Sequence, residues 1–326
     1  MRLAQAYQIL SLDGGGVKGL FSAAVLAQLE NDCGSHVEDH FDLIAGTSTG
    51  GLIALGLGLG MRPREIVEFY VREGPRIFAD PLRLRSLRRV RRPKFRSSGL
   101  AKSLQECFGT RLLGESTKRL VIPSYNLADD DVYIFRTPHH ERLKRDHRVE
   151  AWRVAMATAA APTYFDAFLG VDRIPLIDGG VWANNPTMVA VVEAMGTLAV
   201  PPGAIKVMSL GTSQPVKRGE RRLESGGIWQ WALPSAQVFL RGQALCATNQ
   251  AGHLLGKKNV VRLDPVVPDR AFRLDRLNVD ELMAMAAHES RKLCPEFEAV
   301  FRGHVAPPFR SALIRENAHA DHRTVR

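Results

Sequence analysis

Ser48 is the residue of this sequence whose surroundings point most directly to chemistry. It lies at the centre of Gly-Thr-Ser-Thr-Gly, residues 46–50, between an apolar segment, 41–45, and a segment rich in glycine and leucine, 51–60. A strand that turns sharply into a helix projects such a hydroxyl from the turn, and the helix directs its N-terminal amides and positive dipole end at the oxygen. The pattern predicts a nucleophilic serine, with a serine that only hydrogen-bonds its own turn as the alternative.

A glycine-rich loop near the N-terminus is suited to receiving negative charge. It follows the alternating segment 7–12 and contains three consecutive glycines, Gly14, Gly15 and Gly16. Glycines between a strand and a helix expose backbone N–H groups, which fit either a tetrahedral oxyanion or a phosphate. We therefore expect this loop to bind an anion.

The same loop matches the dinucleotide-binding pattern G-x-G-x-x-G through Gly14, Gly16 and Gly19. That interpretation requires an acidic residue at the end of the second strand, about twenty residues on. Asp39 and Asp42 lie in that neighbourhood, but Asp42 stands at the start of the apolar strand rather than at its end. We therefore favour the interpretation as an anion-binding loop that serves the serine.

Asp178 is the first candidate for a general base. It ends a short apolar segment, 174–177, and is followed by two glycines, which leave room for its carboxylate to point into a cleft. The common alternative is a turn aspartate that accepts backbone amides. A Ser-His-Asp triad would instead place a histidine after the aspartate, and His253 and His288 occupy such positions, although each also fits a surface or helix-packing histidine.

The order of these motifs resembles that of the patatin-like phospholipases. The blocks that carry the resemblance are residues 13–19, 46–50, 159–165, 178–180, 182–186 and 209–213, and together they cover the chain from 7 to about 215. The resemblance implies a Ser-Asp dyad in which Ser48 is the nucleophile and Asp178 the general base. It also implies an oxyanion hole at the glycine loop, catalysis without a metal or other cofactor, and a basic residue, Lys18, that either meets a substrate phosphate or is solvated.

The dyad is also chemically reasonable. A carbonyl attacked by a serine develops negative charge on its oxygen, and each amide preorganised towards that charge contributes roughly 3 kcal/mol to lowering the barrier. The aspartate would take the serine proton, and water would hydrolyse the resulting acyl-enzyme. A carboxyl group with an ordinary pKa near 4 is a poor base for a hydroxyl, so we expect burial to raise the pKa of Asp178.

Residues 13–19 and 40–78 are most similar to the stand-alone patatin enzymes that act as effectors of cyclic-nucleotide-activated antiphage defence. This resemblance implies cleavage of membrane phospholipids, activation by a cyclic dinucleotide and a homo-oligomer on activation. Two alternatives stay open: an ungated cytosolic esterase or lipase of lipid metabolism, and a catalytically inactive module that binds lipid or nucleotide.

Length and composition predict one α/β domain. The chain has 326 residues, of which 45% are hydrophobic, and short apolar segments alternate with helical ones. We expect a patatin-like three-layer α/β/α fold with a central, mainly parallel sheet over residues 1–302, and a polar, flexible tail over 303–326. The expected strands are 7–12, 42–46, 119–124, 131–135, 173–177 and 205–210. The expected helices are 19–31, 49–59, 63–72, 98–107, 150–160, 186–196, 235–250 and 279–301.

The net charge of +10 is concentrated in residues 83–96, which contain eight basic residues and no acidic one. Apolar residues are interspersed, so this segment predicts a membrane or other anionic surface formed by Arg85, Arg88, Arg89, Arg91 and Arg92, with a solvated loop as the alternative. It lies within residues 61–100, which we expect to cover the active site. The basic residues of 83–96, or those of 217–222, are the candidates for binding the nucleotide. No recognition motif for sequence-specific nucleic-acid binding accompanies the arginines.

Cysteine usage and the N-terminus favour the cytoplasm. The cysteines, Cys33, Cys107, Cys246 and Cys294, are scattered without a C-x-x-C pattern and are typical of reduced core residues. The first expected strand begins close to Met1, which leaves no room for a signal peptide, and the longest apolar segment, 50–61, is too short to span a bilayer. We expect peripheral contact with the inner membrane when the protein is active.

Overall fold

A seven-stranded sheet forms the centre of the protein. The computed structural model describes residues 6–77, 93–212, 214–215, 221–231, 234–267 and 279–309. The strand order is β4-β3-β2-β1-β6-β8, with β5 paired to β3 outside this path. The strands are β1 (Tyr7–Leu12), β2 (Leu43–Gly46), β3 (Arg119–Asn126), β4 (Asp131–Arg136), β5 (Leu176–Asp178), β6 (Ile205–Leu210) and β8 (Val260–Leu263). A separate two-stranded sheet pairs β7 (Gln214–Pro215) with β9 (Val266–Val267).

The sheet is parallel where the functional motifs lie. β1 pairs in parallel with β2 and β6, β2 with β3, and β6 with β8, whereas β4 and β5 run antiparallel to β3. The carboxyl ends of β1 and β2 therefore meet at one edge of the sheet, which is where ligands bind in open α/β sheets. This topology brings the loop after β1 next to the turn after β2.

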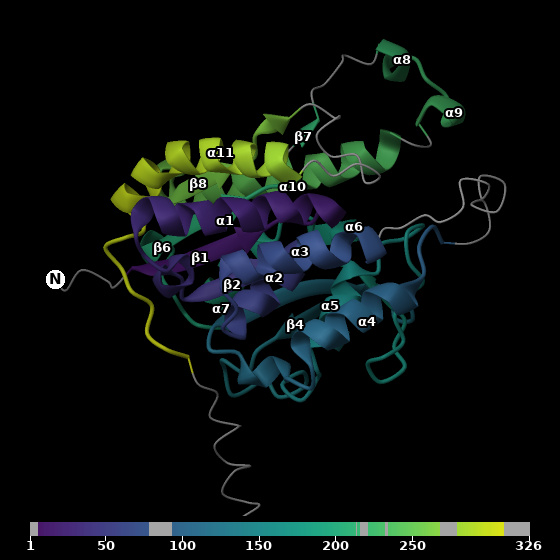
Figure 1. Ribbon diagram of the computed structural model, residues 1–326, viewed down its shortest axis with the longest axis horizontal. Helices are drawn as coiled ribbons and strands as arrows, with labels where there is room; N and C mark the ends of the chain where they lie inside the picture. Colours follow the sequence, from purple (N-terminus) through teal and green to yellow (C-terminus); the bar gives the residue numbers. More distant parts are fainter. Residues whose placement is uncertain are drawn as a thin grey trace, which may run out of the picture.

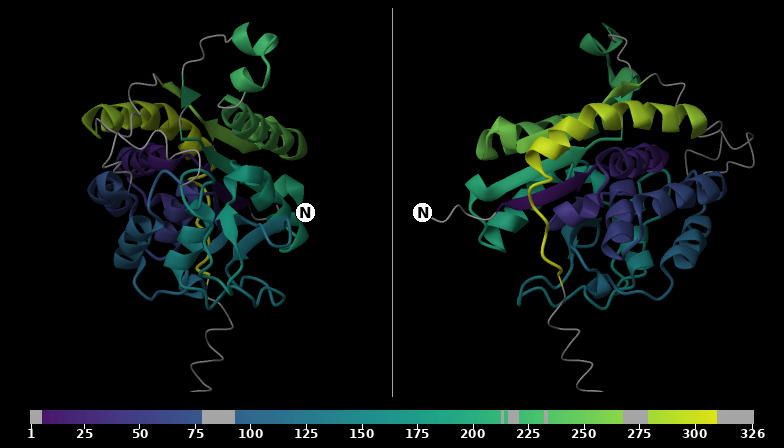
Figure 2. Two further views of the ribbon diagram at one scale, coloured as in Figure 1. Left: turned by 90° about the vertical axis from the view of Figure 1, so that its right-hand side faces the viewer. Right: turned by 60° about the vertical axis from the view of Figure 1, so that its left-hand side comes forward.

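Helices cover both faces of the sheet, as the sequence predicts (Figures 1 and 2). On one face the apolar core contains residues of α1 (Gly19–Cys33), α2 (Thr49–Gly58), α3 (Pro63–Ile77), α4 (Ser97–Phe108), α5 (Ala151–Ala159) and α11 (Val279–Val300). On the other face it contains residues of α7 (Thr187–Gly196) and α10 (Pro234–Leu255). Successive residues of β1 alternate between the two cores, since Ile9 belongs to the second and Leu10 to the first. The remaining α-helices are the short α6 (Gly180–Ala183), α8 (Arg221–Glu224) and α9 (Ile228–Trp231).

The expected fold class is confirmed, and every expected strand and helix has a counterpart. The largest shifts are at the ends of α3, which continues to Ile77 rather than 72, and of α10, which continues to Leu255 rather than 250, and β5 begins at Leu176 rather than 173. β8 and the short strands β7 and β9 are absent from the sequence-based expectation. β8 is half-buried at the edge of the sheet and has four residues, so it carries little of the apolar alternation by which strands are identified.

Residues 303–309 continue along the domain beneath the amino ends of β1 and β2. The Ala306 N–H donates to the Asp39 carbonyl over 2.7 Å, and Phe309 is buried. The rest of the expected tail lies outside the described residues. So do residues 78–92 of the segment 61–100 that was expected to cover the active site, with Arg85, Arg88, Arg89, Arg91 and Arg92, and most of the second basic segment. Within the described part of the chain, no helix is both long and apolar enough to cross a membrane.

Candidate active site

Ser48 occupies a strained turn between β2 and α2. Its backbone has φ 54° and ψ −122°, a conformation that non-glycine residues rarely adopt and that costs roughly 1–3 kcal/mol. The flanking glycines permit the turn, because a Cβ at Gly46 would lie 2.1 Å from the Gly50 carbonyl oxygen and a Cβ at Gly50 would lie 2.2 Å from that of Leu12. The predicted strand, turn and helix are therefore all present around the serine.

Thr158 on α5 holds this turn in place. Its hydroxyl accepts the Ser48 N–H over 2.9 Å and donates to the Pro123 carbonyl over 2.6 Å, so the strained residue is tied to both α5 and β3. The threonine is fully buried. Nothing in the sequence indicates this role, since a threonine inside a helical segment carries no motif of its own.

Asp178 ends β5 and lies beside Ser48. Its backbone N–H donates to the Ala160 carbonyl over 3.0 Å, and its Oδ1 accepts the Gly180 N–H over 2.7 Å. Burial raises the pKa of Asp178 to about 6, while hydrogen bonds from the Ser48 hydroxyl and the Gly180 amide oppose the rise. The fold thus brings together the two residues of the predicted dyad and gives the carboxylate the raised basicity that we expected.

The glycine loop after β1 reaches the serine. A Cβ at Gly14 would lie 3.3 Å from the Ser48 Cβ, so a side chain at this position would crowd the nucleophile. The Gly14 N–H donates to the Asn184 carbonyl over 2.9 Å and is therefore already bonded. Gly15 and Gly16 are exposed, and their N–H groups have no acceptor in the described part of the protein. Of the three predicted oxyanion donors, two are available in this conformation.

A buried ion pair anchors the glycine loop. Arg262 on β8 donates to both carboxylate oxygens of Asp13, over 2.8 and 2.6 Å, and also to Ser209 over 2.7 Å. Burial raises the pKa of Asp13 to about 6 although Arg262 opposes this. Arg262 is not among the residues predicted from the sequence, because an arginine in an unrecognised edge strand gives no local signal of a partner far away in the chain.

Asn184 links the loop to the dyad. A Cβ at Gly14 would lie 2.6 Å from its Oδ1, and a Cβ at Gly180 would lie 3.3 Å from the same atom. The preceding residue is also fixed, since the Thr47 hydroxyl donates to the Ala183 carbonyl over 2.6 Å. The block 182–186 thus closes the space between the glycine loop and the turn after Asp178.

Other candidates lie away from this cluster. His253 and His288 are exposed on α10 and α11 and are not among the hydrogen-bond partners of Asp178, so the triad finds no support. Asp42 precedes β2, at the end of that strand opposite to the turn, where it accepts the Gln8 N–H over 2.8 Å. It therefore cannot act as the ribose ligand of a dinucleotide at the glycine loop. Lys18 is half-buried at the end of η1 (Gly16–Lys18), next to that loop.

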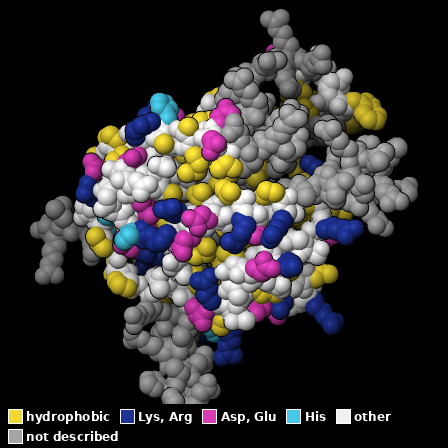
Figure 3. Space-filling model, viewed as in Figure 1, with side chains coloured by type: hydrophobic (Ala, Val, Ile, Leu, Met, Phe, Trp, Pro, Cys, Tyr) yellow, Lys and Arg dark blue, Asp and Glu magenta, His cyan; other side chains and the backbone are white. Residues whose placement is uncertain are grey.

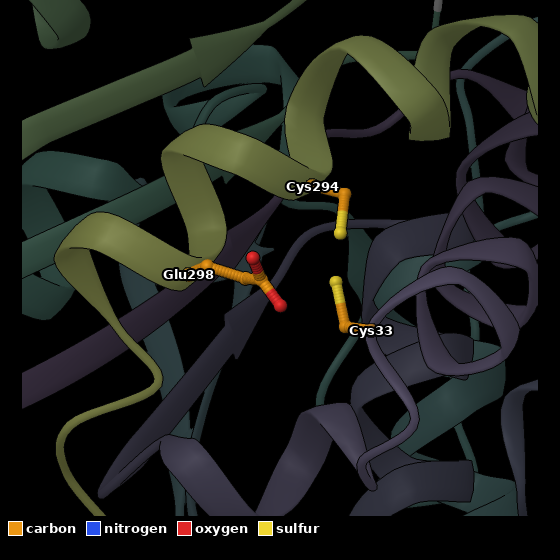
Figure 4. Close-up of side chains that lie close together, drawn as sticks. All are labelled: Cys33, Cys294 and Glu298. Atoms are coloured by element: carbon orange, nitrogen blue, oxygen red, sulfur yellow. The ribbon is translucent and has the colours of Figure 1, made fainter.

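Two clusters have metal-ligand residue types among the described residues, and both lie at the far end of α1. Cys33, Cys294 and Glu298 point toward one another between α1 and α11, with ligand atoms within 4.8 Å (Figure 4). Burial raises the pKa of the Cys33 thiol to about 12, which disfavours the thiolate form that binds metals. Gly19 begins α1 at the end that faces the serine. Cys33 lies fourteen residues further along the helix, which is a distance of about 21 Å.

The second cluster combines Glu30, His36 and Glu38. Arg62 already supplies a cation there, with contacts of 2.6 Å to Glu30 and 2.5 Å to Glu38. Neither cluster contributes to the geometry around Ser48.

Comparisons with known proteins show what the chain is similar to. A family model described as patatin-like phospholipase matches residues 10–191. A protein of Pseudomonas aeruginosa named cGAMP-activated phospholipase is 34% identical over 281 residues, which is 84% of each chain. A protein of Vibrio cholerae with the same name is 32% identical over 332 residues, or 90% of this chain and 92% of that protein. Among solved structures, VipD from Legionella pneumophila aligns with a TM-score of 0.47 and 12% identity, covering 94% of this chain and 68% of VipD.

Proposed function

Because the chain belongs to the patatin-like phospholipase family, whose members are hydrolases of lipid esters, we propose that it cleaves acyl esters of membrane phospholipids with a Ser48–Asp178 dyad. The observation that carries this proposal is the buried carboxylate of Asp178, which bonds to the Ser48 hydroxyl and has a pKa of about 6. A carboxylate of that basicity is ionised at neutral pH and accepts a proton more readily than an exposed one.

The first half of the reaction forms an acyl-enzyme. Asp178 takes the hydroxyl proton as the Ser48 oxygen attacks the ester carbonyl carbon, and the carbonyl oxygen becomes an oxyanion. The free N–H groups of Gly15 and Gly16 then donate to that oxygen, and removing one such donor raises the barrier by roughly 3 kcal/mol. The tetrahedral intermediate collapses, the ester bond breaks, and the proton passes from Asp178 to the departing lysophospholipid oxygen.

The second half restores the enzyme. Water gives a proton to Asp178 and attacks the acyl carbonyl, the oxyanion forms again at the glycine loop, and the Ser48 oxygen leaves with the proton. α2 supports both halves, because its N-terminus directs a positive dipole end at the serine. Lys18, at the edge of the same loop, is our candidate for the residue that contacts the phosphate of the substrate.

The proposal includes a nucleotide switch. The similar proteins of Pseudomonas aeruginosa and Vibrio cholerae are both named cGAMP-activated phospholipase, and the alignments extend over at least 84% of this chain. We therefore infer activation by a cyclic dinucleotide, with assembly into a homo-oligomer and degradation of the cell's own membrane as an antiphage response. An ungated lipid hydrolase is the second candidate, because Asp178 already bonds to the Ser48 hydroxyl in this conformation.

Fatty-acid release from vesicles of phosphatidylglycerol and phosphatidylethanolamine tests the proposal. The proteins to compare are the wild type, Ser48→Ala, Asp178→Ala and Ser225→Ala, with an exposed serine as the matched control, each with and without a panel of cyclic dinucleotides. We expect release that needs one nucleotide, is lost in both dyad variants and is unchanged in Ser225→Ala. Release without nucleotide would leave the ungated enzyme. Activity retained in Ser48→Ala would exclude the dyad.

A covalent serine probe separates the enzyme from an inactive binding module. A fluorophosphonate should label the wild type but not Ser48→Ala, because only the activated hydroxyl attacks phosphorus. Absence of labelling in the wild type under every nucleotide condition would favour the binding module.

A further inference from the structure

Large apolar side chains are exposed on α9 and on the first turns of α10. Trp229 has 92% of its surface exposed, Ile228 86% and Phe239 65%, and Val238 is exposed beside them. We call these four residues the α9–α10 surface. Hydrophobic side chains gather at the upper right of Figure 3, where Figure 1 places α9. Exposed apolar surface of this kind marks a site of contact with a partner or a membrane.

The charges around this surface are unusual for an exposed helix. Residues 225–255, which include α9 and α10, contain no aspartate or glutamate, although the chain has 34 of them, and Arg241 is their single lysine or arginine. An exposed helix in water normally carries charged residues of both signs on its outer face. A segment without acidic groups on a chain of net charge +10 is compatible with an anionic partner.

The α9–α10 surface begins at the rim of the active site. Gln243, one helical turn after Phe239, donates to the Val181 carbonyl over 2.9 Å and accepts the Asn184 N–H over 3.5 Å. Val181 is itself exposed and lies three residues after Asp178. In Figure 1, β1 runs away from the labelled N-terminus. The side toward which it runs carries α6, α9 and the first turns of α10. Phe239 is thus one helical turn from a residue that contacts the block beside Asp178.

A second group with interfacial chemistry lies in the loop after α5. Lys94 is the first basic residue in the described part of the basic segment. It donates its N–H to the Thr163 carbonyl over 2.9 Å, and its ammonium lies 5.7 Å from the centre of the exposed Tyr164 ring. This loop follows Ala160, whose carbonyl accepts the Asp178 N–H. Tyrosine, tryptophan and lysine are the side chains enriched where proteins meet lipid headgroups.

We propose that the α9–α10 surface docks on an anionic phospholipid bilayer and presents lipid to Ser48. This inference rests on the proposed function, since it says how the substrate reaches the site. Trp229 and Phe239 enter the headgroup layer, while Lys94 and Tyr164 also contact headgroups. A bilayer fits better than a second copy of the chain, because a second copy with the same surface would bring no acidic side chain to Arg241 and would repeat the net positive charge.

Binding to vesicles measures this docking separately from the chemistry. Sedimentation with phosphatidylglycerol and phosphatidylethanolamine vesicles is measured for Ser48→Ala, which leaves the lipid intact, and for the same protein with Trp229→Ala or Phe239→Ala, with and without cGAMP. Burying an aromatic side chain of this size predicts about a tenfold loss of vesicle affinity for each substitution. Val192→Ala is the matched control, since Val192 is 60% exposed on α7, and it should bind as Ser48→Ala alone does.

A soluble short-chain ester separates docking from hydrolysis. In the background with an intact serine, Trp229→Ala and Phe239→Ala should hydrolyse p-nitrophenyl butyrate as the wild type does, but release at least tenfold less fatty acid from vesicles. Vesicle binding unchanged by both substitutions overturns the inference. So does a change of oligomeric state with unchanged vesicle binding, which would make this surface a contact between copies. If the wild type hydrolyses neither substrate while Ser48→Ala binds vesicles through Trp229 and Phe239, the proposed function fails and the docking surface stands.

Discussion

Asp13 and Asp178 are both buried at the carboxyl edge of the sheet, and their partners differ. Asp13 has the bidentate contact with Arg262, whereas Asp178 bonds to the Ser48 hydroxyl and the Gly180 amide, neither of which carries a charge. The Asp13 carboxylate is held by a charged partner, whereas the Asp178 carboxylate accepts the hydroxyl proton that a general base must take. The first aspartate therefore fits a structural role and the second a catalytic one.

The pKa of Asp178 predicts how hydrolysis depends on pH. The base must be ionised to take the Ser48 proton, so kcat/KM for a soluble ester should be constant above pH 7 and fall below pH 6. At pH 5 it should be about tenfold lower than on the plateau, because a pKa one unit above the pH leaves about a tenth of the base ionised.

Asp13 is the necessary control for that profile, because the pKa of its carboxyl group is also raised to about 6. Asp13→Asn keeps the size of the side chain but removes its charge. If Asp178 is responsible, this variant should retain a fall in kcat/KM below pH 6, whatever its plateau. If kcat/KM no longer falls below pH 6 in Asp13→Asn, the fall in the wild type is due to protonation of Asp13 rather than of Asp178.

The same burial predicts that Asp178→Asn stabilises the protein. The folded-state pKa of about 6 lies above the ordinary pKa of 3.8, so ionisation destabilises the folded protein increasingly from pH 4 to pH 6 and fully above pH 6. An amide avoids this cost. The gain in free energy of unfolding should therefore be about 3 kcal/mol at pH 8 and about 1 kcal/mol at pH 4.5. Urea unfolding at both values checks it, and an equal gain at the two would contradict ionisation of the buried carboxyl group as the cause.

At the scale of elements, the position of Ser48 depends on how closely α2 approaches β1. Gly50 lies in the first turn of α2, and the Leu12 carbonyl occupies the place of a side chain. Gly19, at the start of α1, has the Thr49 side chain at the corresponding place. Glycine at these two contacts lets the starts of α1 and α2 pack closely against the ends of β1 and β2. This close packing brings the glycine loop next to the serine.

Gly50→Ala and Gly242→Ala should therefore have opposite effects. Alanine is about 1 kcal/mol more favourable than glycine in a helix, and Gly242 lies in the middle of α10 with open space around its Cα, so that substitution should stabilise by about this amount. Gly50→Ala should instead destabilise by about 1–3 kcal/mol through overpacking. It should also lower esterase activity about a hundredfold, because a displacement of about 1 Å at the nucleophile is enough for that. Thermal unfolding and ester hydrolysis check both, and a stabilised, fully active Gly50→Ala would contradict the close approach of α2 to β1 as the reason for this glycine.

The elements around Ser48 could be predicted because each has a local signal. The apolar segments, the glycines at the turns and the Asp-Gly-Gly sequence all lie within a few residues of the feature that they indicate. Thr158 and Arg262 could not be found in this way. Their functions come from hydrogen bonds to Ser48 and Asp13, which lie 110 and 249 residues away in the chain, and only the packed sheet brings these pairs together.

At the scale of the whole molecule, residues after α11 fasten the amino edge of the sheet, opposite the active site. His304 Nε2 lies 2.7 Å from Asp42 Oδ2, and the Gln8 side chain donates to the Phe301 carbonyl over 2.9 Å. Both contacts are buried and join positions more than 260 residues apart. The strands that carry the glycine loop and the serine are thus held at one end by the chain's last described segment.

His304→Ala should therefore destabilise the whole domain without touching the dyad. The substitution leaves a carboxylate oxygen of Asp42 buried with one partner fewer, which predicts a loss of about 2 kcal/mol in the free energy of unfolding. His288→Ala, at an exposed position on α11, should change it by less than about 0.5 kcal/mol. Hydrolysis of a soluble ester at a temperature where both variants are folded should match the wild type. Equal stability of the two variants would show that the contact between His304 and Asp42 contributes nothing, and a folded but inactive His304→Ala would mean that the amino edge of the sheet also sets the geometry at Ser48.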